Sequence, residues 1–176
     1  RAAVVGAGPA GLAAAAVLRR HGHAVTLYDD HPAAGGMLRY GVGAEVLPAA
    51  DLEADLARIL GLGIHFVPDS AVADAEAIEG LRRQFGAVIL AAGSQAPCQA
   101  WGLATGPHGL VVDRATQETS MPGVFAAGGI IREIRKMAVR AVASGKAAGE
   151  AAHRFLLGET GPLPGRLLNV SMGPLR

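Results

Sequence analysis

The chain has 176 residues, a formal net charge of +1 and a mean hydropathy of +0.32, and 51% of its residues are hydrophobic. These values predict one folded domain with an apolar core, and no basic stripe indicates a nucleic-acid partner. The single cysteine, Cys98, excludes an internal disulfide and a cysteine-built iron–sulfur or zinc site in this sequence, and it favours a cytoplasmic location.

The first predicted elements are a strand over Ala2–Val5, a glycine-rich turn and a helix over 12–20. The turn reads Gly-x-Gly-x-x-Gly through Gly6, Gly8 and Gly11. In such a motif the first glycine permits a tight turn, the second lets a pyrophosphate approach the backbone, and the third lets the helix pack close to the strand. The helix N-terminus then faces the phosphates. The alternative is a strand–turn–helix whose glycines serve packing alone.

A second predicted strand, Ala24–Tyr28, is followed directly by Asp29. This carboxylate lies about 20 residues beyond the glycines, where dinucleotide-binding units place an acceptor for a ribose hydroxyl. Asp30 takes that place if the strand register is shifted by one residue. The alternative for Asp29 is a surface acid at a strand end.

A glycine- and proline-rich loop over Asp30–Gly43 comes next. Its stretch Gly35–Gly41 contains too much glycine to predict a stable helix. Its place beside the predicted phosphate site makes it a candidate second clamp on a ligand.

Helices and strands alternate over the rest of the chain. We expect helices over Pro48–Leu60, Asp74–Phe85 and Lys136–Leu157, and strands over Ile64–Val67, Ala87–Ala92, Leu110–Asp113 and Val124–Ala127. This order predicts an α/β fold, a Rossmann-like FAD/NAD(P)-binding domain with a central parallel sheet, a small antiparallel β element and helices on the faces. Residues 1–158 form this single domain, and 159–176 form a tail rich in proline and glycine.

Other chemistry is not indicated by the sequence. The six histidines are scattered, without a pair at metal-ligand helical spacing, so we expect surface or edge roles for them and no metal site. We find no acid–base pair or nucleophile that predicts a catalytic residue. No run is long and apolar enough to predict a transmembrane helix, and the glycine motif argues against a signal peptide. Trp101 is interpreted either as a cover over part of a cofactor or as a surface plug.

Taken together, the motifs resemble the FAD-binding domain of the glutamate synthase small-subunit (NADPH) family of FAD-dependent pyridine nucleotide oxidoreductases. The resemblance runs in order through nearly all of 1–158 and depends on Val4–Gly11, His31–Val42, Leu47–Pro48, Val88–Gly93, Val112–Gly128 and Gly145–Ala148.

Two departures from the family pattern stand out. The family inserts a pyridine-nucleotide domain after the strand that ends at Gly93, whereas here residues 94–109 are too few for a Rossmann unit. The family closes with Gly-Gly-Asp, whose aspartate holds the ribityl-phosphate region of the flavin, whereas Gly129 stands at that position. We expect flavin binding there to be weakened or to use the backbone N–H groups of Gly129 and Ile130.

The resemblance implies FAD as the cofactor and the following cofactor-binding residues: Gly6, Gly8, Pro9, Ala10, Gly11, Asp29, Asp30, Gly36, Met37, Leu38, Arg39, Val72, Ala92, Gly93, Gly128, Gly129, Met137 and Ala138. Arg39 would offer charge to a phosphate, with a solvated loop cation as the alternative. Val72 would meet the adenine through its backbone, and Met137 and Ala138 would open the last helix toward the flavin, with core packing as the alternative for Met137.

The implied function is an FAD-binding oxidoreductase subunit or domain that relays electrons between redox partners in a hetero-oligomeric complex. Iron–sulfur proteins are among the partners that the resemblance implies. Two alternatives stay open: a fragment of a complete NAD(P)H-dependent FAD oxidoreductase, and a degenerate, non-catalytic Rossmann module with a structural or assembly role.

Overall fold

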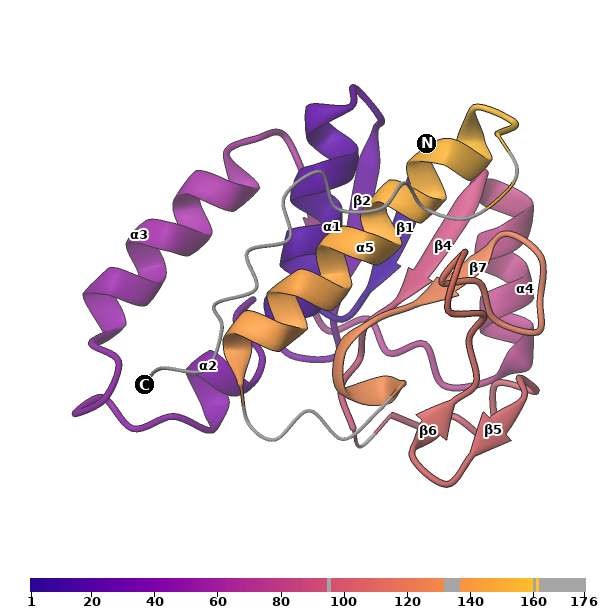
Figure 1. Cartoon of the computed structure of the whole chain (residues 1–176). Helices are drawn as coiled ribbons and strands as arrows, with labels where there is room; N and C mark the ends of the chain where they lie inside the picture. Colours follow the sequence, from indigo (N-terminus) through magenta and orange to yellow (C-terminus); the bar gives the residue numbers. More distant parts are fainter. Residues whose placement is uncertain (95, 132–136, 160, 162–176) are drawn as a thin grey trace, which may run out of the picture.

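The computed structural model describes residues 1–94, 96–131, 137–159 and 161. Five strands form one parallel sheet in the order β3-β2-β1-β4-β7, and β5 and β6 form a separate antiparallel pair (Figure 1). The strands are β1 (Ala2–Val5), β2 (Val25–Tyr28), β3 (His65–Val67), β4 (Ala87–Leu90), β5 (Thr105–Gly106), β6 (Gly109–Leu110) and β7 (Val124–Ala126). The predicted α/β architecture, with a central parallel sheet and a small antiparallel element, is confirmed.

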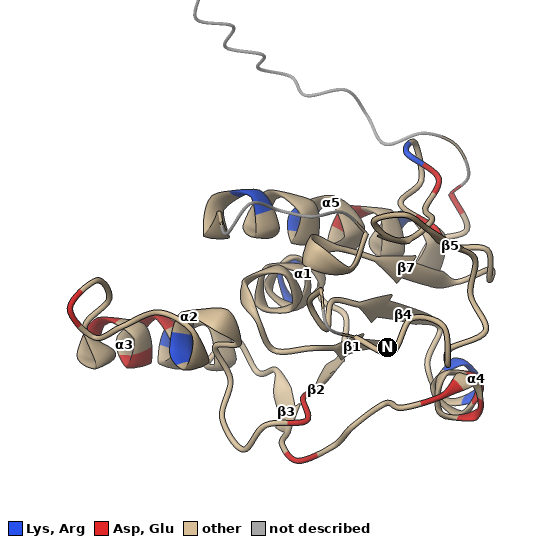
Figure 2. Cartoon of the chain, turned by 90° about the horizontal axis from the view of Figure 1, so that it is seen from below, with Lys and Arg blue, Asp and Glu red and all other residues tan. Residues whose placement is uncertain are grey.

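Helices cover both faces of the sheet. They are α1 (Pro9–Arg20), α2 (Met37–Tyr40), α3 (Ala49–Leu60), α4 (Ala75–Gln84), a 3-10 turn η1 (Gly128–Ile130) and α5 (Ala138–Leu156). Figure 2 shows α1 and α5 on one face and α4 on the other, with α2 and α3 beyond the β3 side. The helix predicted from Lys136 is confirmed from Ala138 onward, and Lys136 lies outside the described residues, as does most of the predicted tail.

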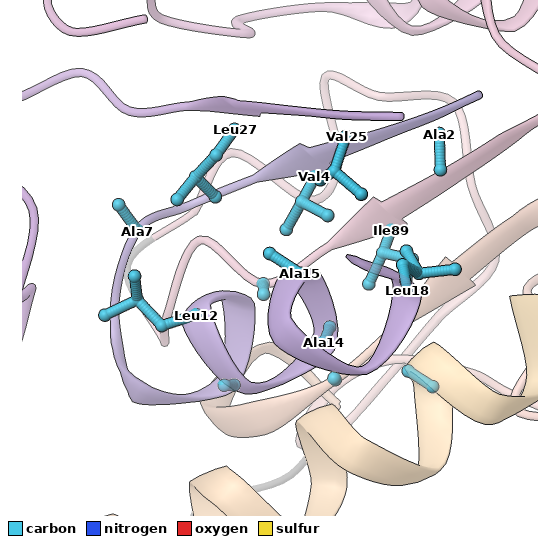
Figure 3. Close-up of a cluster of buried hydrophobic side chains, with 14 of the residues drawn as sticks. Ala2, Val4, Ala7, Leu12, Ala14, Ala15, Leu18, Val25, Leu27 and Ile89 are labelled. Atoms are coloured by element: carbon cyan, nitrogen blue, oxygen red, sulfur yellow. The ribbon is translucent and has the colours of Figure 1, made fainter. Parts of the chain in front are cut away.

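Strand side chains alternate between two hydrophobic cores because successive residues of a strand point to opposite faces. In β1, Val4 faces the α1–α5 side, whereas Val5 faces the α4 side. In β4, Ile89 and Leu90 divide in the same way. The core on the α1–α5 side is shown in Figure 3, where Val4 and Ile89 point toward Ala15 and Leu18 of α1.

Helices α1 and α5 approach each other through small residues. A Cβ atom on Gly145 of α5 would lie 2.0 Å from the backbone oxygen of Ala10, and one on Gly149 would lie 3.0 Å from that of Ala14. Both glycines are therefore required by close helix packing.

Three details of the sequence-based interpretation are wrong. Residues 37–40 form a helical turn, because Gly36 adopts φ 51° and the side chain of Tyr40 donates to the carbonyl of Ala33 at 3.1 Å. The strand expected over Leu110–Asp113 ends at Leu110, because the Asp113 carboxylate accepts the N–H groups of a turn at 115 and 116.

The third wrong detail concerns Trp101. Its side chain is neither a surface plug nor positioned as a cover over a cofactor. Its side chain is 1% exposed and belongs to the core on the α4 side. The indole N–H donates to the carbonyl of Val72 at 2.8 Å. A buried indole needs such an acceptor, so Trp101 anchors the connection after β4 to the segment after β3.

Among the helices of the described residues, none combines the length and the apolar character needed to cross a bilayer.

Candidate functional site

The predicted site residues gather at the carboxyl edge of the parallel sheet. Strand β1 lies between β2 and β4, so the direction of strand order reverses beside it. Ligands of open α/β sheets bind at such a switch point, outside the carboxyl ends of the strands. Figure 2 views the molecule from this edge, where the glycine turn after β1 leads into α1.

Two glycines of the motif are explained by contacts inside the chain. Gly6 adopts φ +102°, and a Cβ atom there would lie 2.5 Å from the backbone oxygen of Ala91 and 2.8 Å from Cα of Ala92. A Cβ atom on Gly11 would lie 1.8 Å from the backbone oxygen of Gly6. The turn and the close approach of α1 to β1 therefore both need glycine, as the motif predicts.

Gly8 has no such internal reason. It adopts φ −77° and ψ −178°, which any residue can adopt, and the nearest atom to a Cβ there would be Cα of Gly36 at 3.9 Å. Gly8 is the N-cap of α1, and the helix has neither a side-chain cap nor an acidic residue in its first turn. Its backbone therefore presents N–H groups and a positive dipole end, and a Cβ atom at this position would fit without a clash.

The predicted clamp loop packs directly against this turn. The N–H of Gly35 donates to the carbonyl of Ala7 at 2.9 Å. A Cβ atom on Gly36 would lie 2.7 Å from Cα of Gly8, so the two backbones touch at a point where only glycine fits. The sequence placed these segments side by side correctly, and α2 begins at the contact.

Two further glycine segments complete the edge. Ala127 donates to the carbonyl of Leu90 at 2.9 Å, which holds the end of β7 beside β4. A Cβ atom on Gly128 would lie 2.8 Å from Cβ of Ala10, and one on Gly129 would lie 3.3 Å from the N atom of Ser94. Gly129 is thus packed closely against the residue that follows Gly93.

Ser144 is a site-supporting residue that the sequence reasoning missed. Its hydroxyl accepts the N–H of Gly128 at 2.9 Å and so joins η1 to the first turns of α5. Sixteen positions separate the two residues. No motif marked this serine, because a helical serine is common and the contact exists only once α5 has folded back over the sheet.

Asp29 is buried, with 7% of its surface exposed. Its Oδ2 accepts the N–H of Ala7 at 2.5 Å, and its Oδ1 accepts the N–H of His31 at 2.9 Å. The alternative of a surface acid is therefore wrong. The carboxylate lies directly behind the glycine turn, and Asp30 points outward with 66% of its side chain exposed. The contact of either residue with a ribose stays a prediction.

His31 joins the two aspartates. Its Nδ1 lies 3.1 Å from Oδ1 of Asp29 and 2.7 Å from Oδ1 of Asp30. The hydrogen bond to Asp30, supported by Asp29, raises the pKa of His31 above 6.5, against a smaller opposing effect of burial. The imidazole therefore carries positive charge over more of the neutral range than a free histidine.

Arg39 is bound within the chain. Its Nε donates to the carbonyl of Ala34 at 2.7 Å, and its Nη2 pairs with Oε1 of Glu53 in α3 at 2.6 Å. The side chain thus ties the clamp loop to α3 and is not a solvated cation. The predicted contact of Arg39 with a phosphate stays a prediction. The ion pair with Glu53 forms without any phosphate.

The remaining predicted residues lie around the edge with different exposures. Met37 and Met137 are 64% and 47% exposed, so core packing is wrong as the alternative for Met137. Leu38 packs against the core on the α1–α5 side. The carbonyl of Val72 accepts the indole N–H of Trp101, and the contact of Val72 with an adenine stays a prediction.

Three of the histidines form a cluster that the sequence did not indicate. The rings of His21 and His153 stack with centroids 3.8 Å apart, and Nε2 of His23 lies 2.8 Å from Nδ1 of His153. His21 also lies 3.1 Å from Glu150. The cluster sits where α1 and α5 end, about 130 residues apart in sequence.

Two surface hollows lie outside the glycine edge. One of about 510 Å³ is lined by the segment 96–100 with Cys98, and by Thr105, Gly106 and Gly109. Burial raises the pKa of the Cys98 thiol, so it is not activated as a nucleophile. A second hollow of about 200 Å³ lies between the end of α5 and the turn at 116–118.

Comparisons of sequence find relatives among redox enzymes. A family model described as an NAD(P)-binding Rossmann-like domain matches residues 4–50. The glutamate synthase [NADPH] small chain of Mycobacterium tuberculosis is 43% identical over 94 residues, which are 53% of this chain and 19% of that protein. Putative oxidoreductase AegA of Escherichia coli is 39% identical over 94 residues, 53% of this chain and 14% of that protein.

A third relative is the PreT subunit of the NAD-dependent dihydropyrimidine dehydrogenase of Salmonella typhimurium. It is 36% identical over 93 residues, 53% of this chain and 22% of that protein. The chain thus spans about a fifth or less of the length of these curated relatives. The resemblance to the glutamate synthase small-subunit family is confirmed over about half of the chain.

Solved structures extend the likeness in fold to most of the chain. A thioredoxin reductase from Gloeobacter violaceus matches with a TM-score of 0.63 and 16% identity, covering 93% of this chain and 97% of that chain. The thioredoxin reductase of T. acidophilum matches with a TM-score of 0.60 and 12% identity, covering 86% and 97%. At these identities the comparison shows the Rossmann-like fold alone.

Proposed function

We propose that the chain binds FAD across the glycine edge and acts as an oxidoreductase domain or subunit that relays electrons between redox partners in a larger complex. The observation that carries this proposal is that a side chain at Gly8 would meet no clash inside the chain. Packing and backbone conformation account for Gly6 and Gly11, but nothing inside the chain requires glycine at position 8. A pyrophosphate that approaches the backbone closely gives the physical reason.

The residues at this edge suit an anionic dinucleotide. The uncapped first turn of α1 would donate N–H groups to the pyrophosphate, and Gly36 keeps the clamp loop close enough to take part. Asp29, fixed behind the turn, would accept from the adenosine ribose. A bound flavin supplies hydride or one-electron chemistry at its ring, and the chain contributes binding and orientation.

The role as a relay follows from what the resemblance implies and from the connection after β4. Among the described residues between β4 and Leu110, the β5–β6 pair is the only regular secondary structure, and Trp101 is buried. We propose that the pyridine-nucleotide domain of the family is absent between 94 and 109, and that redox partners, iron–sulfur proteins among them, exchange electrons with the flavin. The cytoplasm, proposed from the single cysteine, suits such a complex.

A second candidate is a nicotinamide dinucleotide bound at the same edge. It is favoured by the match of residues 4–50 to an NAD(P)-binding domain model. The two ligands share the adenosine and pyrophosphate groups that the glycine turn would hold, so they are distinguished by direct titration.

The test is equilibrium titration of the full chain with FAD, NADH and NADPH, followed by flavin or nicotinamide fluorescence. Gly8→Ala places a methyl group where the pyrophosphate would lie, and we expect FAD affinity to fall about tenfold or more. Because alanine is a poor N-cap, a stability loss of about 1 kcal/mol is expected as well. The matched control is Gly80→Ala in α4, where a Cβ atom has room and the fold gains stability.

Saturable FAD binding that Gly8→Ala weakens and Gly80→Ala leaves unchanged would support the proposal. Binding of NADH or NADPH without FAD would select the second candidate. If the folded wild-type chain binds none of the three dinucleotides, both candidate functions are overturned and a structural module is favoured. Gly129→Asp is then the first substitution to test for restored binding.

A further inference from the structure

The segment after β2 forms a continuous chain of contacts that the resemblance does not assign. Asp29 accepts the N–H of Ala7 in the glycine turn, and on its other oxygen it accepts the backbone N–H of His31. The His31 ring stacks on the Tyr40 ring of α2, with centroids 4.4 Å apart and planes at 29°. His31 therefore stands between the turn that would hold the pyrophosphate and the helical turn of the clamp loop.

The proton position on His31 follows from its partners. Ionised carboxylates only accept hydrogen bonds, and Nδ1 lies within reach of both Asp29 and Asp30. Nδ1 must therefore carry the proton in the neutral ring, and Nε2 is the nitrogen that gains the second proton. Protonation turns both contacts into bonds between opposite charges, which strengthens them.

Tyr40 fixes the far side of this arrangement. Its hydroxyl donates to the carbonyl of Ala33 at 3.1 Å, so the phenol ring is held where His31 stacks on it. Arg39, the neighbouring cation on α2, is paired with Glu53. From the loop after β3, Asp69 donates its backbone N–H to the carbonyl of His31 at 3.3 Å. Among the described residues, the groups that face His31 are thus acidic or neutral, and they stabilise a charged imidazole.

We propose that His31 is a positioning residue of the dinucleotide site, which holds the Asp29 carboxylate behind the glycine turn and docks the clamp turn through Tyr40, and whose positive charge strengthens binding of the anionic dinucleotide. This inference rests on the proposed function. It adds a residue and a pH dependence that neither the glycine motif nor the resemblance contains.

The direction of the pH dependence follows from the charge. Below the raised pKa of His31 the imidazolium offsets the two aspartates beside a ligand that carries two phosphates. As pH rises through that pKa, the positive charge is lost and the aspartates repel the ligand. Affinity is therefore expected to fall with rising pH.

The experiment measures FAD affinity of the full chain between about pH 6 and 9, across the range where a histidine with a raised pKa titrates. His31→Gln keeps a side-chain donor but cannot take a charge, and we expect about tenfold weaker binding at the acidic end, the size of one charge-assisted bond. Its affinity should then vary little with pH. The matched control is His65→Gln, an exposed histidine on β3, which should keep the wild-type profile.

A second variant separates positioning from charge. Tyr40→Leu removes the stacked ring and should weaken FAD binding at every pH while the slope with pH remains. In the chain without ligand, the Ala7 amide proton is expected to follow the titration of His31 by nuclear magnetic resonance, and this dependence should vanish in His31→Gln.

The outcomes separate the two proposals. If wild type binds FAD and His31→Gln matches His65→Gln in affinity and pH profile, His31 is not a positioning residue and the proposed function stands. If wild type binds no dinucleotide at any pH, the proposed function fails and this inference fails with it.

Discussion

The two ends of the α1–α5 helix pair are built in opposite ways. At the end where both helices begin, the contacts are made by backbone and by small residues, and neither first turn holds an acidic side chain or a side-chain cap. At the end where they finish, three histidines and Glu150 contact one another, and the last turns carry arginines. Basic residues in the last turns complement the negative dipole ends of the helices.

This difference shows where the fold leaves an opening for a ligand. At the finishing ends, the backbone N–H groups of the C-cap residues His21 and Leu157 bond the last carbonyl groups, and basic side chains of the last turns complement the dipoles. Within the part of the chain that the structure describes, the beginning ends have no side-chain cap, and a Cβ atom on Gly8 would meet no clash there. We infer that the opening is the functional end and that the histidine cluster is structural.

The histidines make the contrast electrostatic as well. His31, near the beginning ends, has its pKa raised by Asp30 and Asp29. His23, at the finishing ends, has its pKa lowered, chiefly by burial and further by the neighbouring His153 and His21. His31 therefore binds a proton more readily than a free histidine, and His23 binds one less readily.

The largest expected effect comes from breaking the helix pair that supports both ends. Gly145→Ala drives a methyl group into the backbone of Ala10, which cannot rotate away. We expect a loss of about 3 kcal/mol in the free energy of unfolding, measured by urea denaturation. Gly80→Ala in α4 is the control and should gain up to about 1 kcal/mol. Equal stability of the two variants would mean that the helices are not in this contact.

A smaller effect is expected at the beginning ends alone. Ser144→Ala leaves the N–H of Gly128 without its acceptor at 2.9 Å. We expect a loss of about 1–2 kcal/mol in stability, together with weaker FAD binding. Ser70→Ala, which removes an exposed hydroxyl bonded to the carbonyl of Pro68, is the control and should change stability less. If Ser144→Ala leaves the FAD affinity unchanged, η1 does not take part in FAD binding.

The pH dependence of stability sharpens the contrast, with smaller effects still. Because the pKa of folded His23 lies below its unfolded value of 6.5, the unfolded chain binds more protons, and stability falls as pH falls through 6.5. Because the pKa of folded His31 lies above 6.5, its contribution is present below that pH and is lost as pH rises through the folded pKa.

Urea denaturation across this pH range is the measurement for both histidines. His23→Gln should remove the acid-side loss of stability, and His31→Gln should remove the loss on the alkaline side. If the free energy of unfolding depends on pH in the same way in both variants, the pKa values of His23 and His31 are not shifted in opposite directions. His65→Gln serves as the control for each.

The smallest effect is expected for Glu150→Gln at the finishing ends. Its pair with His21 is 3.1 Å long, and the two side chains are 36% and 47% exposed. Solvent screens such pairs, so we expect a change of at most about 0.5 kcal/mol in stability. A change above about 1 kcal/mol would show that the carboxylate orders the stacked rings.

Much of the fold could be predicted from the sequence because its determinants are local. The strands β1 and β4 and the helices α3 and α4 all depend on neighbours within a few positions. The Gly-x-Gly-x-x-Gly spacing likewise fixes a turn between adjacent elements. These features were predicted correctly, with boundaries shifted by a few residues.

Other features depend on partners far along the chain. Trp101 is buried because the segment after β4 folds back onto α4 and Val72, and its burial has no local cause. The helical turn of α2 exists because Arg39 and Tyr40 bond back to the carbonyls of Ala34 and Ala33. Glycine content alone favoured a loop there.

The sequence by itself determined the order β1–α1–β2, the glycine turn and the place of Asp29 after β2, because these follow from residue spacing within one strand–turn–helix unit. Only the tertiary structure decided that Asp29 is buried and bonded to Ala7, that His31 bridges it to Tyr40, and that His21, His23 and His153 meet. Such contacts form only when the crossover connections bring distant segments together, so the spacing of residues along the sequence does not predict them.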